Sequence, residues 1–259
     1  MIVGRQNAGR TIAYSKPLRV PRARPARRRR RAWTHGLEID RPALACLVIV
    51  PIARRYSRRL SVSAAILAGG RSRRMGRDKA WLDLGDGVPL VRRVADALEQ
   101  VADEIVVVAN DERYASLGLP RVPDRYGEKG AFGGIATAVA ATRGELVCVG
   151  ACDMPWPSPD VYRLLLRLAD GHDVAIPRIG DDLETMHAVY RRTCLPAMER
   201  ALARGDMRVI SFFPDVRVRE VRGDDLRRAD PDLRSFTNLN TPEELERARQ
   251  EFARRARPA

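Results

Sequence analysis

Short apolar runs alternate along the chain with longer segments in which apolar residues recur at helical spacing. The short runs have the length of buried strands and occupy residues 63–67, 104–109, 121–124, 145–151 and 173–177. The helical segments between them occupy residues 88–101, 130–142 and 159–169. This alternation predicts an α/β fold with a mostly parallel sheet and helices on both faces.

Four of the predicted strands lead directly into residues suited to binding a ligand. These residues are Gly69, Asn110, Asp124 and Asp153. In open α/β sheets, ligands bind beyond the carboxyl ends of the strands. We therefore expect these four separated segments to converge at one edge of the sheet.

The excess of positive charge is confined to the start of the chain. The protein has 259 residues and a net charge of +14, which suggests a nucleic-acid or anionic-membrane partner. Residues 1–60 hold 16 of the 47 Lys and Arg residues but only two of the 33 Asp and Glu residues. Residues 61–259 therefore hold 31 basic and 31 acidic side chains and have no net charge. The charge of these residues gives no support for a nucleic-acid or membrane partner.

We interpret residues 1–60 as a basic, disordered leader and residues 61–259 as the folded domain. Residues 22–31 are nearly all Arg, Pro and Ala, a composition that does not form a core. A nucleic-acid arm, a targeting segment and an anchor are alternatives, but the apolar residues 43–53 are too few for a span of roughly twenty. We favour a dispensable leader or a misassigned start near Val62, because a predicted strand begins at Ser63 without a linker.

The four cysteines show neither metal-binding spacing nor a disulfide framework. They are Cys46, Cys148, Cys152 and Cys194. Burial as small hydrophobic residues is the favoured interpretation, and it fits a reducing, cytoplasmic compartment.

A basic, glycine-containing loop follows the first predicted strand. Gly69 and Gly70 end the apolar run, and five Arg and Lys residues follow before residue 80, offset only by Asp78. Glycine lets backbone N–H groups approach a phosphate, and Arg and Lys supply charge. The loop matches neither the Walker pattern nor the dinucleotide fingerprint. Phosphate binding is favoured over a basic surface turn.

Residues 67–79 read Leu-Ala-Gly-Gly-x-Ser-x-Arg-Met-Gly-x-Asp-Lys, which resembles the signature loop of nucleotidyltransferases. The Gly-Gly form that ends in Asp-Lys is most similar to the molybdenum cofactor guanylyltransferases, a MobA-like family. The resemblance covers roughly residues 64–247 and implies a Rossmann-like nucleotidyltransferase fold. It implies that the loop wraps the triphosphate of the nucleotide, with contacts from Leu67, Ala68, Gly69, Gly70 and Lys79. Lys79 and Arg74 are then expected to act in catalysis, Arg74 on the charge of the leaving pyrophosphate.

Asp153 is the strongest candidate for a metal ligand. It follows an apolar strand, and Pro155 stops that strand from continuing. The alternative is a helix cap, but Ser158 or Asp160 can serve the helix that begins near residue 159. Mg²⁺ takes a few carboxylate oxygens together with waters and substrate phosphates. The resemblance likewise implies that Asp153 holds Mg²⁺ beside the nucleotide and acts in catalysis.

Five further side chains are candidate contacts. The resemblance implies that Asn110 touches the nucleotide and that Asp124 helps to hold the guanosine, although Asn110 is equally suited to capping a helix. His187 is expected either to contact the pterin substrate or to pack in the structure. Asn238 and Asn240 precede a predicted helix start and are free to face the metal and phosphates.

These parts favour direct nucleotidyl transfer, because no activated Ser or Cys accompanies the phosphate loop. The resemblance implies that GMP passes from GTP to the terminal phosphate of molybdopterin, releasing pyrophosphate. We also expect a monomer or weak oligomer and transient contact with molybdoenzyme maturation proteins. The short apolar stretch and the neutral domain favour neither a membrane nor a nucleic-acid partner.

Two other functions stay open. A cytidylyltransferase acting on the molybdenum cofactor, or on another small phosphorylated acceptor, would keep the fold, and Gly70 argues against it because cytidine-using relatives carry Leu-Ala-Ala-Gly in this loop. The second open function is a non-catalytic one, either a cofactor-handling module or a nucleic-acid binder. Two observations argue against nucleic-acid binding. The domain has no net charge, and the arginine-rich part of the leader has no interleaved aromatic residue apart from Trp33.

Overall fold

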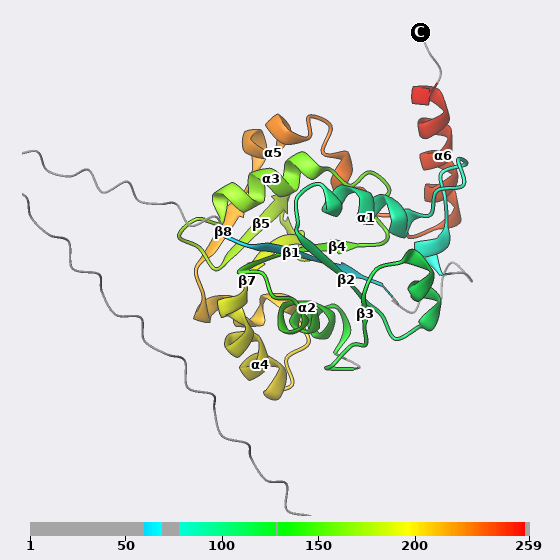
Figure 1. Ribbon diagram of the computed structural model, residues 1–259. Helices are drawn as coiled ribbons and strands as arrows, with labels where there is room; N and C mark the ends of the chain where they lie inside the picture. Colours follow the sequence, from blue (N-terminus) through cyan, green and yellow to red (C-terminus); the bar gives the residue numbers. More distant parts are fainter. Residues whose placement is uncertain (1–59, 69–77, 128, 257–259) are drawn as a thin grey trace, which may run out of the picture. The chain divides into compact units, whose positions relative to one another are not determined.

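A computed structural model describes residues 60–68, 78–127 and 129–256 of the chain (Figure 1). Within these ranges the strands are β1 (Val62–Leu67), β2 (Glu104–Val108), β3 (Arg121–Val122), β4 (Leu146–Ala151), β5 (Val174–Ile179), β6 (Asp182–Leu183), β7 (His187–Arg191) and β8 (Val218–Val221). The α-helices are α1 (Leu90–Glu99), α2 (Gly130–Ala141), α3 (Pro159–Leu168), α4 (Leu195–Ala203), α5 (Gly223–Ala229) and α6 (Pro242–Ala256). The predicted leader lies outside the described residues apart from Leu60.

The strands of the described residues form one eight-stranded sheet. Its order is β3-β2-β1-β4-β7-β5-β6, and β8 pairs with β5. Strands β1 to β4 run parallel, whereas β7 lies antiparallel between β4 and β5. The prediction of an α/β fold with a mostly parallel sheet is confirmed, and the reversed β7 is a feature that the sequence pattern did not reveal.

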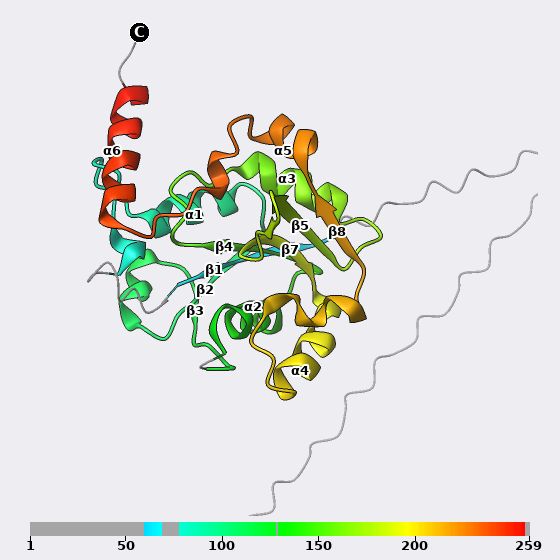
Figure 2. The same ribbon diagram turned by 180° about the vertical axis from the view of Figure 1, so that it is seen from behind.

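Helices cover both faces of the sheet. In both views α1, α3 and α5 lie on one side and α2 and α4 on the other (Figures 1 and 2). Strand β1 supplies both cores, because successive side chains of a strand point to opposite faces. Ala64 and Ile66 pack into the first core and Ala65 into the second, and all three are fully buried. A strand buried on both faces explains the continuous apolar run from which it was predicted.

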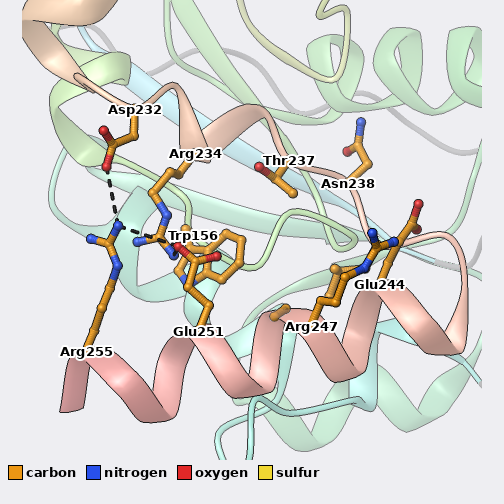
Figure 3. A pocket seen from close by; sticks show the side chains of 11 residues that line it. Trp156, Asp232, Arg234, Thr237, Asn238, Glu244, Arg247, Glu251 and Arg255 are labelled. Carbon is orange, nitrogen blue, oxygen red and sulfur yellow. Dashed lines mark hydrogen bonds and ion pairs between the residues drawn. The ribbon is translucent and has the colours of Figure 1, made fainter. Parts of the chain in front are cut away.

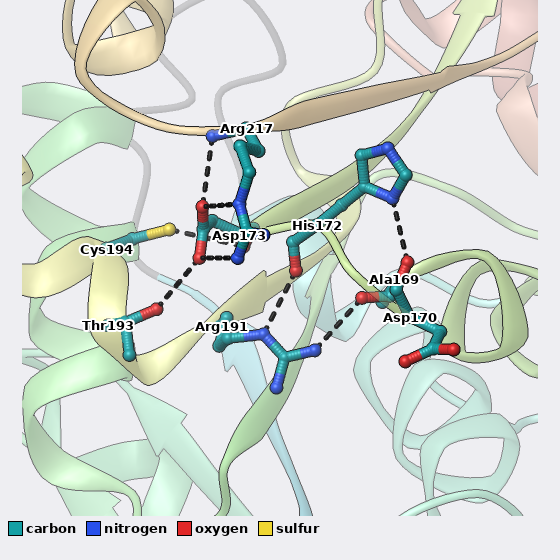
Figure 4. A network of polar contacts seen from close by, with 8 residues as sticks. All are labelled: Ala169, Asp170, His172, Asp173, Arg191, Thr193, Cys194 and Arg217. Carbon is teal, nitrogen blue, oxygen red and sulfur yellow. Dashed lines mark hydrogen bonds and ion pairs between the residues drawn. The ribbon is translucent and has the colours of Figure 1, made fainter.

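A polar cluster around Asp173 joins β5, β7 and β8 at the end of the sheet away from the expected site (Figure 4). The Asp173 carboxylate accepts hydrogen bonds from the backbone N–H of Arg217 (3.0 Å), from its Nε (3.1 Å) and from Thr193 Oγ1 (3.1 Å). The Asp173 carbonyl accepts from the N–H of Arg191 at 2.7 Å, and Arg191 Nε donates to the His172 carbonyl at 3.0 Å. The hydrogen bond from the Arg217 guanidinium is the main reason that the pKa of Asp173 is lowered. These bonds fix β5 against both neighbouring strands.

Helix α6 packs through a small apolar cluster of its own. Leu245 and Ala248 of the helix contact Leu84, Leu90 and Leu239, and all five side chains are buried. Leu90 begins α1, so the cluster fixes the first turns of α6 beside the start of α1. The C-terminal helix is thereby held close to the carboxyl ends of the central strands.

Three of the four cysteines lie in the described ranges. Cys148, Cys152 and Cys194 are free thiols and buried, as expected for small hydrophobic residues. Burial raises the pKa of the Cys148 thiol to about 12. Among the described helices, none is long and apolar enough to cross a membrane.

Candidate active site

The carboxyl ends of four parallel strands meet in register. The last residue of β1, Leu67, lies opposite Val108 of β2 and Ala151 of β4, and Val108 lies opposite Val122 of β3. The backbone N–H of Ala68 donates to the carbonyl of Val108 at 3.0 Å, which extends the pairing beyond the strand. The residues that follow these strands are therefore brought to one edge.

Lys79 is the centre of a polar cluster at this edge. Its Nζ donates to Asn240 Oδ1 at 2.9 Å and lies 3.9 Å from Asp153 Oδ2. Lys79 opens a 3₁₀ helix, residues 79–81, in which the Asp78 side chain accepts from the N–H of Ala80 at 3.2 Å. The structure thus brings together three of the residues expected from sequence, although they come from three distant segments of the chain.

The Asp153 carboxylate is mostly buried, with its side chain 25% exposed. Burial raises the pKa of Asp153, and the nearby charge of Lys79 opposes this rise. Within the described residues, Asp153 Oδ1 is buried and has no hydrogen-bond partner. A buried carboxylate oxygen without a donor is costly unless a cation or a ligand meets it. Asp153 is therefore suited to binding one.

Glu184 is a second acidic side chain of this region. Burial raises its pKa, and the charges of Asp182 and Asp153 raise it further. The negative charge of Asp153 therefore acts on Glu184. The sequence analysis assigned Glu184 no role, because nothing in its local pattern shows that the start of β7, just after Glu184, pairs with the end of β4.

The segment before α6 is fixed by its main chain. The N–H of Leu239 donates to the Asp153 carbonyl at 2.9 Å. Glu244 Oε2 accepts from the N–H groups of Asn240 and Thr241 at 2.5 and 3.0 Å, and Thr241 Oγ1 accepts from the N–H of Glu244 at 3.2 Å. This reciprocal capping box orients Asn240 toward Lys79.

Asn110 and Asp124 lie next to one another beyond β2 and β3. Asn110 Oδ1 accepts from the backbone N–H of Asp124 at 2.9 Å. The Asp124 Oδ1 accepts from Thr137 Oγ1 at 2.9 Å and from the N–H of Tyr126 at 3.0 Å. Asp111, not Asn110, caps the next helical turn, residues 112–117. The helix-cap alternative for Asn110 is therefore wrong, and its contact with a nucleotide stays a prediction.

Two supporting residues were missed by the sequence analysis. Asp78 Oδ2 accepts from Tyr114 Oη at 2.9 Å, so the residue before Lys79 is fixed to the segment after β2. Thr137 lies in the interior of α2, is 1% exposed and holds Asp124. A buried threonine within an otherwise apolar helical segment was the available signal for the second.

His187 is fully buried in the core beneath the site. Its ring stacks on Tyr162 with centroids 4.4 Å apart and lies 5.0 Å from Phe236. Nδ1 lies 3.3 Å from the Met154 sulfur. Burial lowers the pKa of His187 to about 4, so the ring is neutral at pH 7. This geometry gives His187 a packing role, and contact with a pterin stays a prediction.

Other predicted residues remain to be placed. Asn238 is half-buried in the segment before α6, and Leu67 ends β1. Gly69, Gly70 and Arg74 lie outside the described residues. In the described ranges no group of three or more His, Cys, Asp or Glu side chains could hold a metal ion. Mg²⁺ does not require such a group, because it commonly uses one or two carboxylates together with waters and substrate phosphates.

Comparisons with known proteins agree with this geometry. Residues 64–218 match the MobA-like NTP transferase domain. A probable molybdenum cofactor guanylyltransferase of Pelotomaculum thermopropionicum is 40% identical over 192 residues, covering 73% of this chain and 93% of that protein. The molybdenum cofactor guanylyltransferase of Desulfosudis oleivorans is 35% identical over 190 residues, covering 73% and 94%.

A solved structure is similar over the same region. The crystal structure of molybdopterin-guanine dinucleotide biosynthesis protein A from Archaeoglobus fulgidus has a TM-score of 0.65 and 28% identity, covering 74% of this chain and 99% of that one. The fold, the strand-end cluster and these relatives define the class of this protein as a nucleotidyltransferase. Within that class, the chain belongs to the MobA-like NTP transferase family.

Proposed function

We propose that this enzyme transfers GMP from GTP to the terminal phosphate of molybdopterin, releasing pyrophosphate, in a Mg²⁺-dependent reaction in the cytoplasm. The relatives named as molybdenum cofactor guanylyltransferases support this choice of substrates. The observation that carries it is the contact of Lys79 Nζ with Asn240 Oδ1 and its approach to Asp153 Oδ2 at the strand ends. A fixed cation beside a buried carboxylate is suited to a metal-bound polyphosphate.

Asp153 is the described residue that would hold Mg²⁺. Its Oδ1 is buried without a hydrogen-bond donor in the described ranges, and its Oδ2 lies near Lys79, so a metal-bound phosphate would find opposite charges side by side. The metal would supply neutralisation of the negative charge on the reacting phosphates.

The reaction needs no protein nucleophile. An oxygen of the acceptor phosphate attacks the α-phosphorus of GTP, a new P–O bond forms, and the bond from the α-phosphorus to the bridging oxygen of pyrophosphate breaks. A phosphomonoester is mostly ionised at pH 7 because its second pKa is about 6, so no general base is required. Lys79 would hold the triphosphate, and Asn240 orients Lys79. Asn110 and Asp124 would position the nucleoside.

The test is nucleotide selectivity of the purified chain. With Mg²⁺ and GTP, CTP, ATP or UTP, we expect GTP alone to raise the melting temperature strongly and to release pyrophosphate when molybdopterin is added. Omission of Mg²⁺ should abolish release. Pyrophosphate release with CTP in place of GTP would refute the guanylyl assignment and favour the cytidylyltransferase alternative, while GTP binding without turnover on molybdopterin would point to a different acceptor.

A further inference from the structure

A cavity of about 430 Å³ opens between α6 and the segment of residues 232–239 (Figure 3). Its volume lies in the range of small-molecule sites, roughly 300–1,000 Å³. The side chains of Arg247 and Glu251 reach it from α6, that of Arg234 reaches it from the opposite segment, and Trp156 lies between them (Figure 3). Asn238 also lines it. None of these five residues belongs to the Lys79 cluster.

The cavity shares one wall with that cluster. Leu239 and Glu244 both line it. The Leu239 N–H donates to the Asp153 carbonyl at 2.9 Å, and Glu244 Oε2 accepts from the N–H of Asn240 at 2.5 Å. The cavity wall is therefore bonded directly to Asp153 and Asn240, and both of these residues lie beside Lys79 Nζ.

A stacked pair of planar side chains forms part of the cavity lining. The Arg234 guanidinium lies over the Trp156 ring, 4.1 Å from its centroid, and is held by Glu251 at 2.8 Å. Leu239 and Ala248 add apolar surface. A guanidinium stacked on an indole and fixed by a carboxylate loses little freedom on binding and suits a planar heteroaromatic ring.

Charges around the cavity are balanced. Three arginines and three acidic residues line it: Arg234, Arg247, Arg255, Asp232, Glu244 and Glu251. This mixture does not suit a triphosphate, which needs a net positive surface. It suits a ring that both donates and accepts hydrogen bonds. Arg247 differs from the other two arginines, which form ion pairs with Glu251 and Asp232. Among the described residues its guanidinium makes one long hydrogen bond, 3.4 Å from Nε to the Glu243 carbonyl, so this exposed side chain is available to an anionic group at the rim.

The position of the cavity separates it from the expected nucleoside contacts. Helix α6 packs beside the start of α1, whereas Asp124 is bonded to Thr137 of α2, and α1 and α2 lie on opposite faces of the sheet in both views (Figures 1 and 2). Asn110 and Asp124 follow β2 and β3, whereas Lys79, Asp153 and Asn240 form the cluster that borders the cavity. Nucleotide and cavity ligand would thus approach the same cluster from two sides.

We propose that this cavity binds the ring of the acceptor, a fused 2-amino-4-oxopyrimidine heterocycle, over Arg234 and Trp156, with the acceptor phosphate directed toward Lys79 and Asp153. The inference rests on the proposed function for the identity of the acceptor. Guanine has the same 2-amino-4-oxopyrimidine edge as a pterin, so the experiment must distinguish the two sources.

The experiment measures binding to the full chain by calorimetry, with 6-hydroxymethylpterin phosphate as the pterin probe and with GMP and GTP as the guanine probes. We expect Arg247→Gln and Trp156→Leu to weaken the pterin probe at least fivefold and to change the dissociation constants of GMP and GTP less than twofold. Arg254→Gln is the matched control, because Arg254 is exposed on α6 with a similar bond, 3.3 Å from Nε to the Gln250 carbonyl, but does not line the cavity.

Each outcome decides the matter. Unchanged pterin binding in Arg247→Gln, with a melting temperature like that of the wild type, overturns the proposal even if Trp156→Leu does not fold. Weakened GMP or GTP binding in these variants also overturns the proposal and assigns the cavity to the nucleotide. A wild-type chain that does not bind the pterin probe overturns the proposal as well. A wild type that binds the pterin but does not transfer GMP to molybdopterin refutes the proposed function and leaves the cavity assignment standing.

Discussion

The ammonium group of Lys79 connects three parts of the chain that local sequence patterns cannot connect. The loop motif indicated Lys79, and a strand followed by proline indicated Asp153. The hydrogen bond between Lys79 and Asn240 spans 161 residues. Nothing near Asn240 in the sequence reports it, because the bond depends on the packing of α6 and on the capping box that fixes the Asn240 backbone.

Removing the charge of Asp153 should abolish most of the activity. We expect Asp153→Asn to lower kcat by about 100- to 1,000-fold, the range seen when one electrostatic contact to a transition state is lost. The amide is nearly the same shape, so the melting temperature without ligand should change little. Initial rates of pyrophosphate release across a Mg²⁺ titration measure the effect. Activity within tenfold of the wild type at saturating Mg²⁺ would contradict the assigned role.

The buried hydroxyl of Thr137 should matter for nucleotide affinity through Asp124. Thr137→Val keeps the shape but removes the hydrogen bond to Asp124 Oδ1, a loss of about 1 kcal/mol that corresponds to a several-fold rise in KM for GTP. We expect kcat to stay nearly constant and Thr137→Ser to restore the KM. A purely structural role would instead lower the melting temperature of Thr137→Val and leave the KM of the folded enzyme unchanged.

At the scale of elements, the sequence predicted the parallel half of the sheet well and the reversed half poorly. Strands buried on both faces leave continuous apolar runs, so β1, β2 and β4 were found within about one residue of their ends. β6 and β8 are short, at two and four residues, and their patterns contain too few positions to establish a period. The direction of β7 depends on its partners β4 and β5, which are known only from the folded structure.

The site residues were also predicted only in part. Asn110, Asp124 and Asp153 were found because they follow predicted strands, and residues at strand ends converge in any parallel sheet. Asp78, Thr137 and Glu184 were not assigned, because their roles arise from contacts between elements. The convergence of the strands was therefore predictable from the sequence, whereas the bonds that orient each side chain were not.

The burial of His187 on β7 should make the protein less stable in mild acid. Because burial lowers its pKa to about 4, the unfolded chain takes up a proton below pH 6.5 before the folded chain does. The contribution is absent above pH 6.5 and destabilises progressively as the pH falls toward 4, by about 2 kcal/mol at pH 5.

His187→Phe keeps an aromatic ring between Tyr162 and Phe236 but cannot titrate. We expect the wild type to lose about 2 kcal/mol more than His187→Phe between pH 8 and pH 5. Urea unfolding at each pH measures the difference. Parallel pH profiles of the two proteins would show that the buried imidazole does not govern acid stability.

At the scale of the whole molecule, the net positive charge and the assigned site residues lie in different parts of the sequence. Residues 61–259 have equal numbers of acidic and basic side chains, and every assigned site residue lies among them. Residues 1–60 carry the entire excess of +14. Solubility and non-specific association should therefore depend on the leader, and catalysis on the domain.

A chain that begins at Leu60 should keep the activity. Leu60 packs against the first core, and the Ser61 carbonyl accepts from the N–H of Leu146, so the cut leaves β1 supported. We expect kcat and KM for GTP within twofold of the full chain, and loss of any salt-sensitive retention on immobilised DNA. A large fall in kcat would show that the leader contributes to the site, and retained DNA binding would place a nucleic-acid surface on the domain.

The bond between Lys79 and Asn240 also bears on how the enzyme is made. A ribosome synthesises β1 to β7 and the signature loop well before it reaches Asn240, so a nascent chain can pair these strands while the site still lacks this residue. The cluster is completed only when the C-terminal helix docks. Incomplete translation products would therefore have the fold of a nucleotide-binding domain but lack the contact that orients its lysine.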